Sequence, residues 1–392
     1  MKKTAKVLGS VVMMVSSSAI ADDLTDRFTF AGFGYQDFRQ TSANRVDYVD
    51  SGGNWDHNFL GLIMAAQVSD KSKIWAQLQA DSTEQTRFTW LFADYQFTST
   101  LTGHAGRVKF PFGLINEYID NKALQLSLNL PTAYSESADM TYDAYTGVGL
   151  DWNAEGGSLG SLLVQGYAGN TYNPPNSSLA VQYPNNPPVA VGIPLNTQNQ
   201  PTSDHRLLGG RVTWNTPLTG LRFMLSGSAT ELNYAPISSA LAISPTQPNS
   251  TEFRQMYSAE YRKDGIWVQS EYNLHRFPGG GGYSGIDSDS YYLQGGYLMG
   301  KFLPFVRYQS LVTNQNLSSN PNFYQRQWAV GTNYAVTSRV NLRMEADRNH
   351  GYALPIASQG SPYYVAATPV PAGSALPALD WNEFAVELNF SF

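Results

Sequence analysis

Charged side chains recur at every second position in several segments, and their types and spacing are the first pointer to a function. In residues 383–392, 339–347 and 73–81, apolar residues alternate with charged or amide residues. This two-residue period predicts strands with one apolar and one polar face. Charges that share a polar face act on ions and polar solutes through their field.

When the apolar residues of each predicted strand lie on one face, its charged residues lie on the other. The acidic members of this polar set include Asp81, Asp94, Glu260, Glu271 and Glu345. The basic members chosen as candidate site residues are Arg107, Lys109, Arg211, Arg222, Arg307, Arg339 and Arg343.

The sequence gives little support for disulfides or for metal sites built from histidine or cysteine. The chain has no cysteine, which excludes disulfides and thiolate metal sites. The histidines lie on different predicted strands without metal-ligand spacing, so no metal or cofactor is expected. These histidines are His57, His104, His205, His275 and His350.

The elements that must position the charges are sixteen predicted strands. Their joins alternate between short turns and long loops, except for the short join at residues 83–85. Short turns at one rim and long loops at the other indicate an all-β transmembrane antiparallel barrel, with periplasmic turns and extracellular loops. The predicted strands are 27–38, 57–69, 72–82, 86–98, 103–111, 145–153, 159–170, 205–215, 219–233, 252–263, 265–277, 289–299, 301–312, 323–336, 338–349 and 380–392.

Composition supports a barrel in lipid. Only 14% of the residues are charged, against about 25% in soluble proteins, and 13% are aromatic. A lipid-facing apolar surface, a polar lumen and aromatic belts at the membrane interfaces account for both values. Because an Arg or Lys facing lipid at mid-depth costs about 2–4 kcal/mol, the charged faces are expected to point into the lumen.

The amino terminus reads as an export signal. Three lysines precede an apolar run that ends in Ala19-Ile20-Ala21, so residues 1–21 are predicted to be a signal peptide and 22–392 a single barrel domain. Without Lys2, Lys3 and Lys6, the mature chain keeps 22 basic and 31 acidic residues, a net charge of −9. This charge argues against nucleic-acid binding.

The long join at residues 112–144 is the candidate pore-constricting third loop. It carries the remaining candidate site residues, the acids Glu117, Asp120, Glu136 and Asp139. Residues 114–128 show helical spacing and are interpreted as including a short helix. If the loop enters the lumen, its acids face the arginines of the wall, and the field between them orients dipolar solutes.

Three features together resemble the Gram-negative porins. The chain ends on Phe392 after an alternating strand, residues 106–113 resemble the G-x-x-K-x-P-F-G stretch of phosphate-selective and related porins, and the 112–144 join follows directly. The resemblance implies a homotrimer in the cell outer membrane, with Phe392 as part of the signal read by the barrel-assembly machinery. It also implies contact with outer-membrane lipid and lipopolysaccharide. Phosphate selectivity is not carried over, because acids and bases are mixed here.

We therefore expect a porin that allows passive diffusion of small hydrophilic solutes and ions, and no enzymatic activity. The alternative is a substrate-specific channel for a sugar, organic acid or anion, with Trp75, Trp267 and Tyr292 as a stacking surface. A barrel enzyme would need a serine beside His104 or His275, and no residue pattern marks such a nucleophile. An adhesin is a further alternative.

Overall fold

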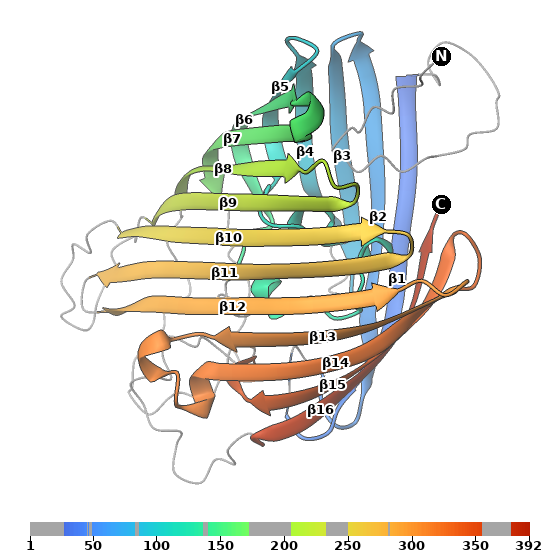
Figure 1. Cartoon of the computed structure of the whole chain (residues 1–392), viewed down its shortest axis with the longest axis vertical. Helices are drawn as coiled ribbons and strands as arrows, with labels where there is room; N and C mark the ends of the chain where they lie inside the picture. Colours follow the sequence, from blue (N-terminus) through green and yellow to red (C-terminus); the bar gives the residue numbers. More distant parts are fainter. Residues whose placement is uncertain are drawn as a thin grey trace.

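The computed structural model is a closed barrel of sixteen antiparallel strands, which confirms the predicted fold class (Figure 1). The structure describes residues 27–44, 46, 49–82, 86–135, 140–171, 205–232, 250–280, 283–354 and 378–392. The strands are β1 (Phe28–Thr41), β2 (Asn54–Ser69), β3 (Ser72–Asp81), β4 (Thr86–Gln96), β5 (Leu101–Lys109), β6 (Ala144–Glu155), β7 (Ser161–Thr171), β8 (His205–Asn215), β9 (Leu221–Leu232), β10 (Ser250–Lys263), β11 (Ile266–Gly280), β12 (Tyr283–Tyr297), β13 (Phe302–Val312), β14 (Tyr324–Ala335), β15 (Val340–Gly351) and β16 (Asp380–Ser391).

Each strand pairs with its neighbours in sequence, and the first and last strands close the barrel. β1 pairs with β16 in a register that runs from Phe33 opposite Ser391 to Thr41 opposite Glu383. Closure gives every strand two hydrogen-bonded neighbours, as hydrocarbon requires because it offers no water to an open sheet edge.

Alternation along the strands sorts side chains onto two faces. On β16, Phe384 and Leu388 are 45% and 48% exposed, whereas Ala385 and Glu387 between them are 0% exposed. The exposed apolar row is the outer face of the wall, and the buried polar row is its inner face. In the described residues, no helix is long and apolar enough to cross a membrane.

The short joins match their turn chemistry. Between β10 and β11, Asp264 and Gly265 both have positive φ, 52° and 83°. Two successive positive φ values define the tight hairpin turn for which Asp-Gly is a preferred pair.

Most strand ends differ from the prediction by a few residues, and two of these differences affect earlier expectations. The join between the strands predicted at 265–277 and 289–299 is largely strand, because the β11–β12 ladder continues to Gly280 opposite Tyr283. The predicted strand at 338–349 begins two residues later, at Val340, so Arg339 lies in the turn before β15.

In the described residues between β5 and β6, the helical structure consists of single turns of 3₁₀-helix. They are η2 (Asn116–Tyr118), η3 (Lys122–Leu124) and η4 (Thr132–Tyr134). The expected short helix in 114–128 is therefore two separate 3₁₀ turns. The Asn121 side chain caps the second turn by accepting a hydrogen bond from the Ala123 amide.

Candidate functional site

Residues 110–135 and 140–143, called here the inner segment, pack against the inner face of the barrel wall. The segment begins with Phe110 and Phe112, both fully buried in a cluster with Tyr167 of β7 and Met256 of β10. In Figure 1 the segment lies behind β9 to β12, within the outline of the barrel.

Gly113 lets the chain turn onto the wall. Its φ is 63°, in the left-handed region that glycine tolerates best. A Cβ at this position would collide with the Met256 sulfur and the Tyr134 hydroxyl. Its amide donates to Ser226 of β9 at 3.0 Å. Both the backbone conformation and the close approach therefore require glycine here.

Glu271 of β11 is the central anchor of the inner segment. Its carboxylate accepts hydrogen bonds from the Leu114 amide at 2.7 Å and from the Tyr134 hydroxyl at 2.6 Å. The wall residues Ser258 and Tyr292 donate to the same carboxylate at 2.5 and 2.6 Å. Four donors on one buried carboxylate fix the first part of the segment to β10, β11 and β12.

Arg211 of β8 holds the next part. Its guanidinium lies 2.6 Å from the Glu117 carboxylate and donates to Gly113 O at 3.2 Å. The Arg211 side chain is 5% exposed, whereas the Glu117 side chain is 38% exposed. The cation of this pair is therefore covered, and its anion meets solvent.

Lys109, at the end of β5, is likewise a covered cation that pairs with carboxylates of the inner segment. Its ammonium lies 2.8 Å from Asp120 and also contacts Asp143. Asp120 in addition accepts a hydrogen bond from Gln77 of β3 at 2.9 Å. Lys109 is 8% exposed and Asp143 is 32% exposed, so the solvent-facing partner is again a carboxylate.

A second anchor lies on β13 and β15. Glu345 accepts hydrogen bonds from the Leu128 and Asn129 amides at 2.6 and 3.0 Å. Arg307 lies 2.7 Å from Glu345 and donates to Asn129 O at 2.6 Å. Both charged side chains are fully buried. The Arg307–Glu345 pair thus binds the backbone of the inner segment, and neither of its charges reaches solvent.

Arg343 of β15 provides a third anchor. It lies 3.0 Å from Glu387 and donates to the backbone carbonyls of Gln125 and Ser127. Lys122 lies close by, and its ammonium donates to Leu128 O at 3.3 Å. Burial of Lys122 lowers the pKa of its ammonium to about 8.

Six of the candidate bases and acids belong to the inner segment or contact it directly. Arg211 pairs with Glu117 and Lys109 with Asp120, as just described. Among the described acids of the segment, only Glu117 pairs with an arginine of the wall as expected. Arg307 and Arg343 instead donate to backbone carbonyls of the segment.

Other candidates lie elsewhere. Arg222 pairs with Glu260 on the neighbouring strand at 2.8 Å. Arg339 is exposed in a turn at the short-join rim. Glu136 and Asp139 lie outside the described residues.

The strand pattern predicts that Arg107 belongs to the inner face, but in the structure it does not. The register sets it opposite Leu91 and Thr146, which are exposed and belong to the outer row. Its guanidinium donates to Thr89 O on β4 at 2.7 Å. The apolar row of this short strand is interrupted by glycine and histidine, so the alternation predicts the wrong face for Arg107.

One group of contacting residues was not among the candidates. Tyr142 of the inner segment donates to Glu252 of β10, and the Arg254 guanidinium lies 4.3 Å from the centre of the Tyr142 ring. Glu252 and Arg254 occupy alternate positions of their strand, so the same polar-face argument could have found them. Alternation alone does not rank the inner charges by importance.

The proposed stacking surface is largely covered. Trp267 and Tyr292 are 6% and 1% exposed, and Trp267 packs against Leu126 of the inner segment. His275 is buried against Glu252, and His104 lies between Asp94 and Asp151 at 2.7 and 3.1 Å. In the described residues, no cluster of His, Asp and Glu could hold a metal ion.

Comparison with known proteins identifies the fold of the chain but no sequence family. No protein-family model matches the chain, and no curated protein matches it in sequence. Among solved structures, an anion-selective porin from Comamonas acidovorans is similar, with a TM-score of 0.58 and 11% identity over 93% of this chain and 100% of that chain.

Two further structures are comparably similar. OmpF of Salmonella typhi, solved in complex with daunomycin, has a TM-score of 0.55 and 10% identity over 93% of this chain and 97% of that chain. The trimer form of in-vitro folded OmpT from Vibrio cholerae has a TM-score of 0.53 and 9% identity, over 93% and 99%. The chain therefore has the fold of these outer-membrane barrels.

Proposed function

We propose that this protein is an outer-membrane porin, through which small hydrophilic solutes and ions diffuse passively, and that the inner segment narrows its lumen. The observation that carries the proposal is the docking of the inner segment on the inner wall through Glu271, Arg211 and Arg307. Barrels of sixteen strands are wide enough to leave an aqueous channel. A segment fixed to one side of such a lumen reduces its cross-section without closing it.

The charges that meet solvent at the inner segment favour cations. Glu117 and Asp143 are the exposed partners in their ion pairs, whereas Arg211 and Lys109 are covered. A solute passing the segment therefore meets carboxylate oxygens first. At physiological salt the Debye length is about 8 Å, so the preference is weak and grows as ionic strength falls.

Three further parts of the proposal concern export and assembly. Residues 1–21 direct export, and the mature barrel inserts into the outer membrane with help from the assembly machinery that reads Phe392. The protein acts as a homotrimer, supported by the trimer form of the structurally similar OmpT. No catalytic step is part of the proposed activity.

The test is single-channel recording from the folded mature protein in a planar bilayer with a salt gradient. We expect stable conductance, in groups of three for a trimer, and a reversal potential with the sign of cation preference. A folded barrel that gives no conductance would refute the channel. Block by one solute at low concentration would instead support the substrate-specific alternative.

A further inference from the structure

His104 lies on the inner face of β5, between two carboxylates. Its Nδ1 is 2.7 Å from Asp94 of β4, and its Nε2 is 3.1 Å from Asp151 of β6. The ladder sets the neighbouring Ala105 opposite Val148, which is 59% exposed on the outer row. Because successive side chains of a strand point to opposite faces, the His104 side chain points into the lumen.

The two partners of His104 constrain where its protons lie. An ionised carboxylate accepts hydrogen bonds but donates none, and a neutral imidazole has a proton on one nitrogen only. In a neutral ring, the second nitrogen would turn its lone pair toward a carboxylate oxygen. Hydrogen bonds from both nitrogens of His104 therefore require a proton on each.

On the β4 side, the contacts of Asp94 leave the charge-balancing role to His104. Asp94 accepts a hydrogen bond from the Trp75 indole, a neutral donor, at 2.9 Å. Lys73 lies opposite Asp94 in the β3–β4 ladder, but its ammonium lies over the Trp75 ring, 5.1 Å from the ring centre. In the part of the chain that the structure describes, His104 is the cationic partner within 4.0 Å of this carboxylate.

On the β6 side, Asp151 connects His104 to the inner segment. The Gln165 amide donates to both Asp151 oxygens at 3.1 Å, and Gln165 Oε1 accepts a hydrogen bond from Arg211 at 2.7 Å. Arg211 in turn pairs with Glu117 of the inner segment at 2.6 Å. One row of contacts therefore runs along the wall from His104 to the solvent-facing acid of the segment.

The triad of His104, Asp94 and Asp151 meets water. The Asp94 and Asp151 side chains are 24% and 21% exposed, and the His104 side chain is 15% exposed. The Arg343–Glu387 pair, by contrast, is almost fully buried. Because β5 begins at Leu101, the triad lies close to the short-join rim, where its charges act on ions that have passed the inner segment.

We propose that His104 is a fixed imidazolium of the lumen wall and a residue that sets the ion preference of the channel. This inference rests on the proposed porin function. The imidazolium balances one of the two carboxylate charges, so the triad attracts cations only weakly. A neutral residue at position 104 leaves both carboxylate charges unbalanced and makes the channel more selective for cations.

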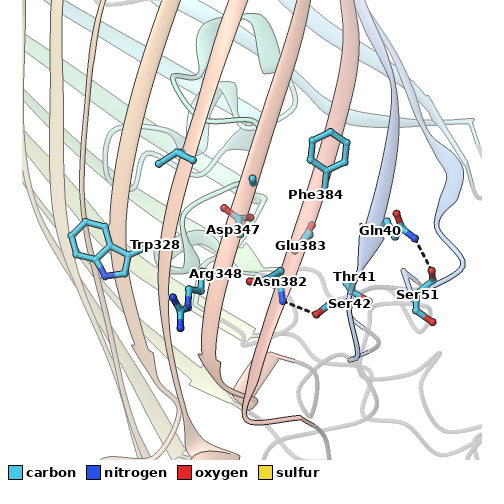
Figure 2. Close-up of a pocket in the computed structure, with 12 residues that line it drawn as sticks. Gln40, Thr41, Ser42, Ser51, Trp328, Asp347, Arg348, Asn382, Glu383 and Phe384 are labelled. Atoms are coloured by element: carbon cyan, nitrogen blue, oxygen red, sulfur yellow. Dashed lines mark hydrogen bonds between the residues drawn. The ribbon is translucent and has the colours of Figure 1, made fainter.

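The first test is the reversal potential of the folded mature protein and three variants in planar bilayers under a salt gradient. His104→Gln removes the positive charge. His104→Arg keeps a positive charge and has donors for both carboxylates. The matched control is Arg348→Gln, which removes one positive charge from the outer face, where Figure 2 shows Arg348 beside Trp328.

We expect His104→Gln to raise the cation-to-anion permeability ratio about two- to threefold at low salt, the effect of one unit charge on an ion about 7 Å away in water. His104→Arg and Arg348→Gln should keep the ratio of the wild type. An unchanged ratio in His104→Gln would overturn the proposal. So would an equal rise in His104→Arg, because a purely structural role of the histidine would be lost in both variants.

The second test does not depend on conductance. Nitrogen NMR of the folded wild type with isotope-labelled histidine reports the protons on both ring nitrogens, and either variant of His104 identifies its signals. At about pH 7.5 a free histidine is mostly neutral, whereas His104 should have two protonated nitrogens. One unprotonated nitrogen would overturn the proposal. Two protonated nitrogens in a folded barrel without conductance would instead refute the porin function, so the two failures are distinguishable.

Discussion

The ring of Phe392 lies directly over Gly32, and the two backbones exchange both of their hydrogen bonds at 2.9 Å. A Cβ on Gly32 would collide with the Phe392 ring. Phe392 therefore closes the barrel against position 32, where only glycine leaves room for its ring.

Substitution of Gly32 should weaken closure. Gly32→Ala forces the Phe392 ring off β1, at a cost of about 1–3 kcal/mol as for other overpacked contacts. The measurement is the yield of folded, heat-modifiable barrel in an in-vitro folding assay. Gly166→Ala is the matched control, because a Cβ there meets nothing within 4 Å. Equal yields from both variants would show that the ring moves aside freely.

Removal of the exposed carboxylates should reduce cation preference. Glu117→Gln with Asp143→Asn leaves Arg211 and Lys109 without their solvent-facing partners, so the local field becomes positive. We expect the reversal potential in a salt gradient to move toward anions, most strongly at low salt. Glu231→Gln makes a similar change on the outer face and should have no effect. An unchanged potential in the double variant would place the selective charges elsewhere.

Loss of the Glu271 carboxylate should release the inner segment. Glu271→Leu leaves the Leu114 amide and the hydroxyls of Tyr134 and Tyr292 without their acceptor. Each unsatisfied buried donor costs about 1–3 kcal/mol. The expected result is noisy conductance and protease cleavage within 112–143. Glu271→Gln keeps an acceptor and should behave closer to wild type; cleavage of neither variant would contradict the anchoring role.

Arg307 and Glu345 should be strongly coupled. Arg307→Met leaves the Glu345 carboxylate buried without its partner, which should destabilise the barrel by about 3–5 kcal/mol. Adding Glu345→Gln should restore part of this loss. Urea unfolding in micelles of both single variants and the double variant measures the coupling. Additive effects would show that the two side chains act independently.

Lys122 should give the folded state a dependence on alkaline pH. Burial, with Arg39 and Arg343 nearby, lowers the pKa of Lys122 to about 8, and the carboxylates of Glu387 and Asp37 oppose this. The unfolded chain keeps the Lys122 proton up to about pH 10.5. Between about pH 8 and 10.5 it therefore binds more protons than the folded state, so the free energy of unfolding rises with pH in this range. The rise should be on the order of 2–3 kcal/mol relative to Lys122→Met, measured by unfolding from pH 7 to 10.5. Parallel curves for the two proteins would mean that Lys122 keeps its ordinary pKa.

The sequence by itself determined the barrel. Alternation along 380–392 and 73–81, with tight turns such as Asp264-Gly265, predicted the strands to within a few residues at most ends. This was possible because side-chain direction in a strand depends only on position parity, a local property. The same argument was wrong for Arg107, where the apolar row of a short strand is broken.

Only the tertiary structure decided which inner charges meet the segment. Leu114 and Glu271 are 157 positions apart, and Arg343 meets Gln125 across 218. No sequence period encodes such contacts, because they depend on where one irregular segment comes to rest against a closed wall.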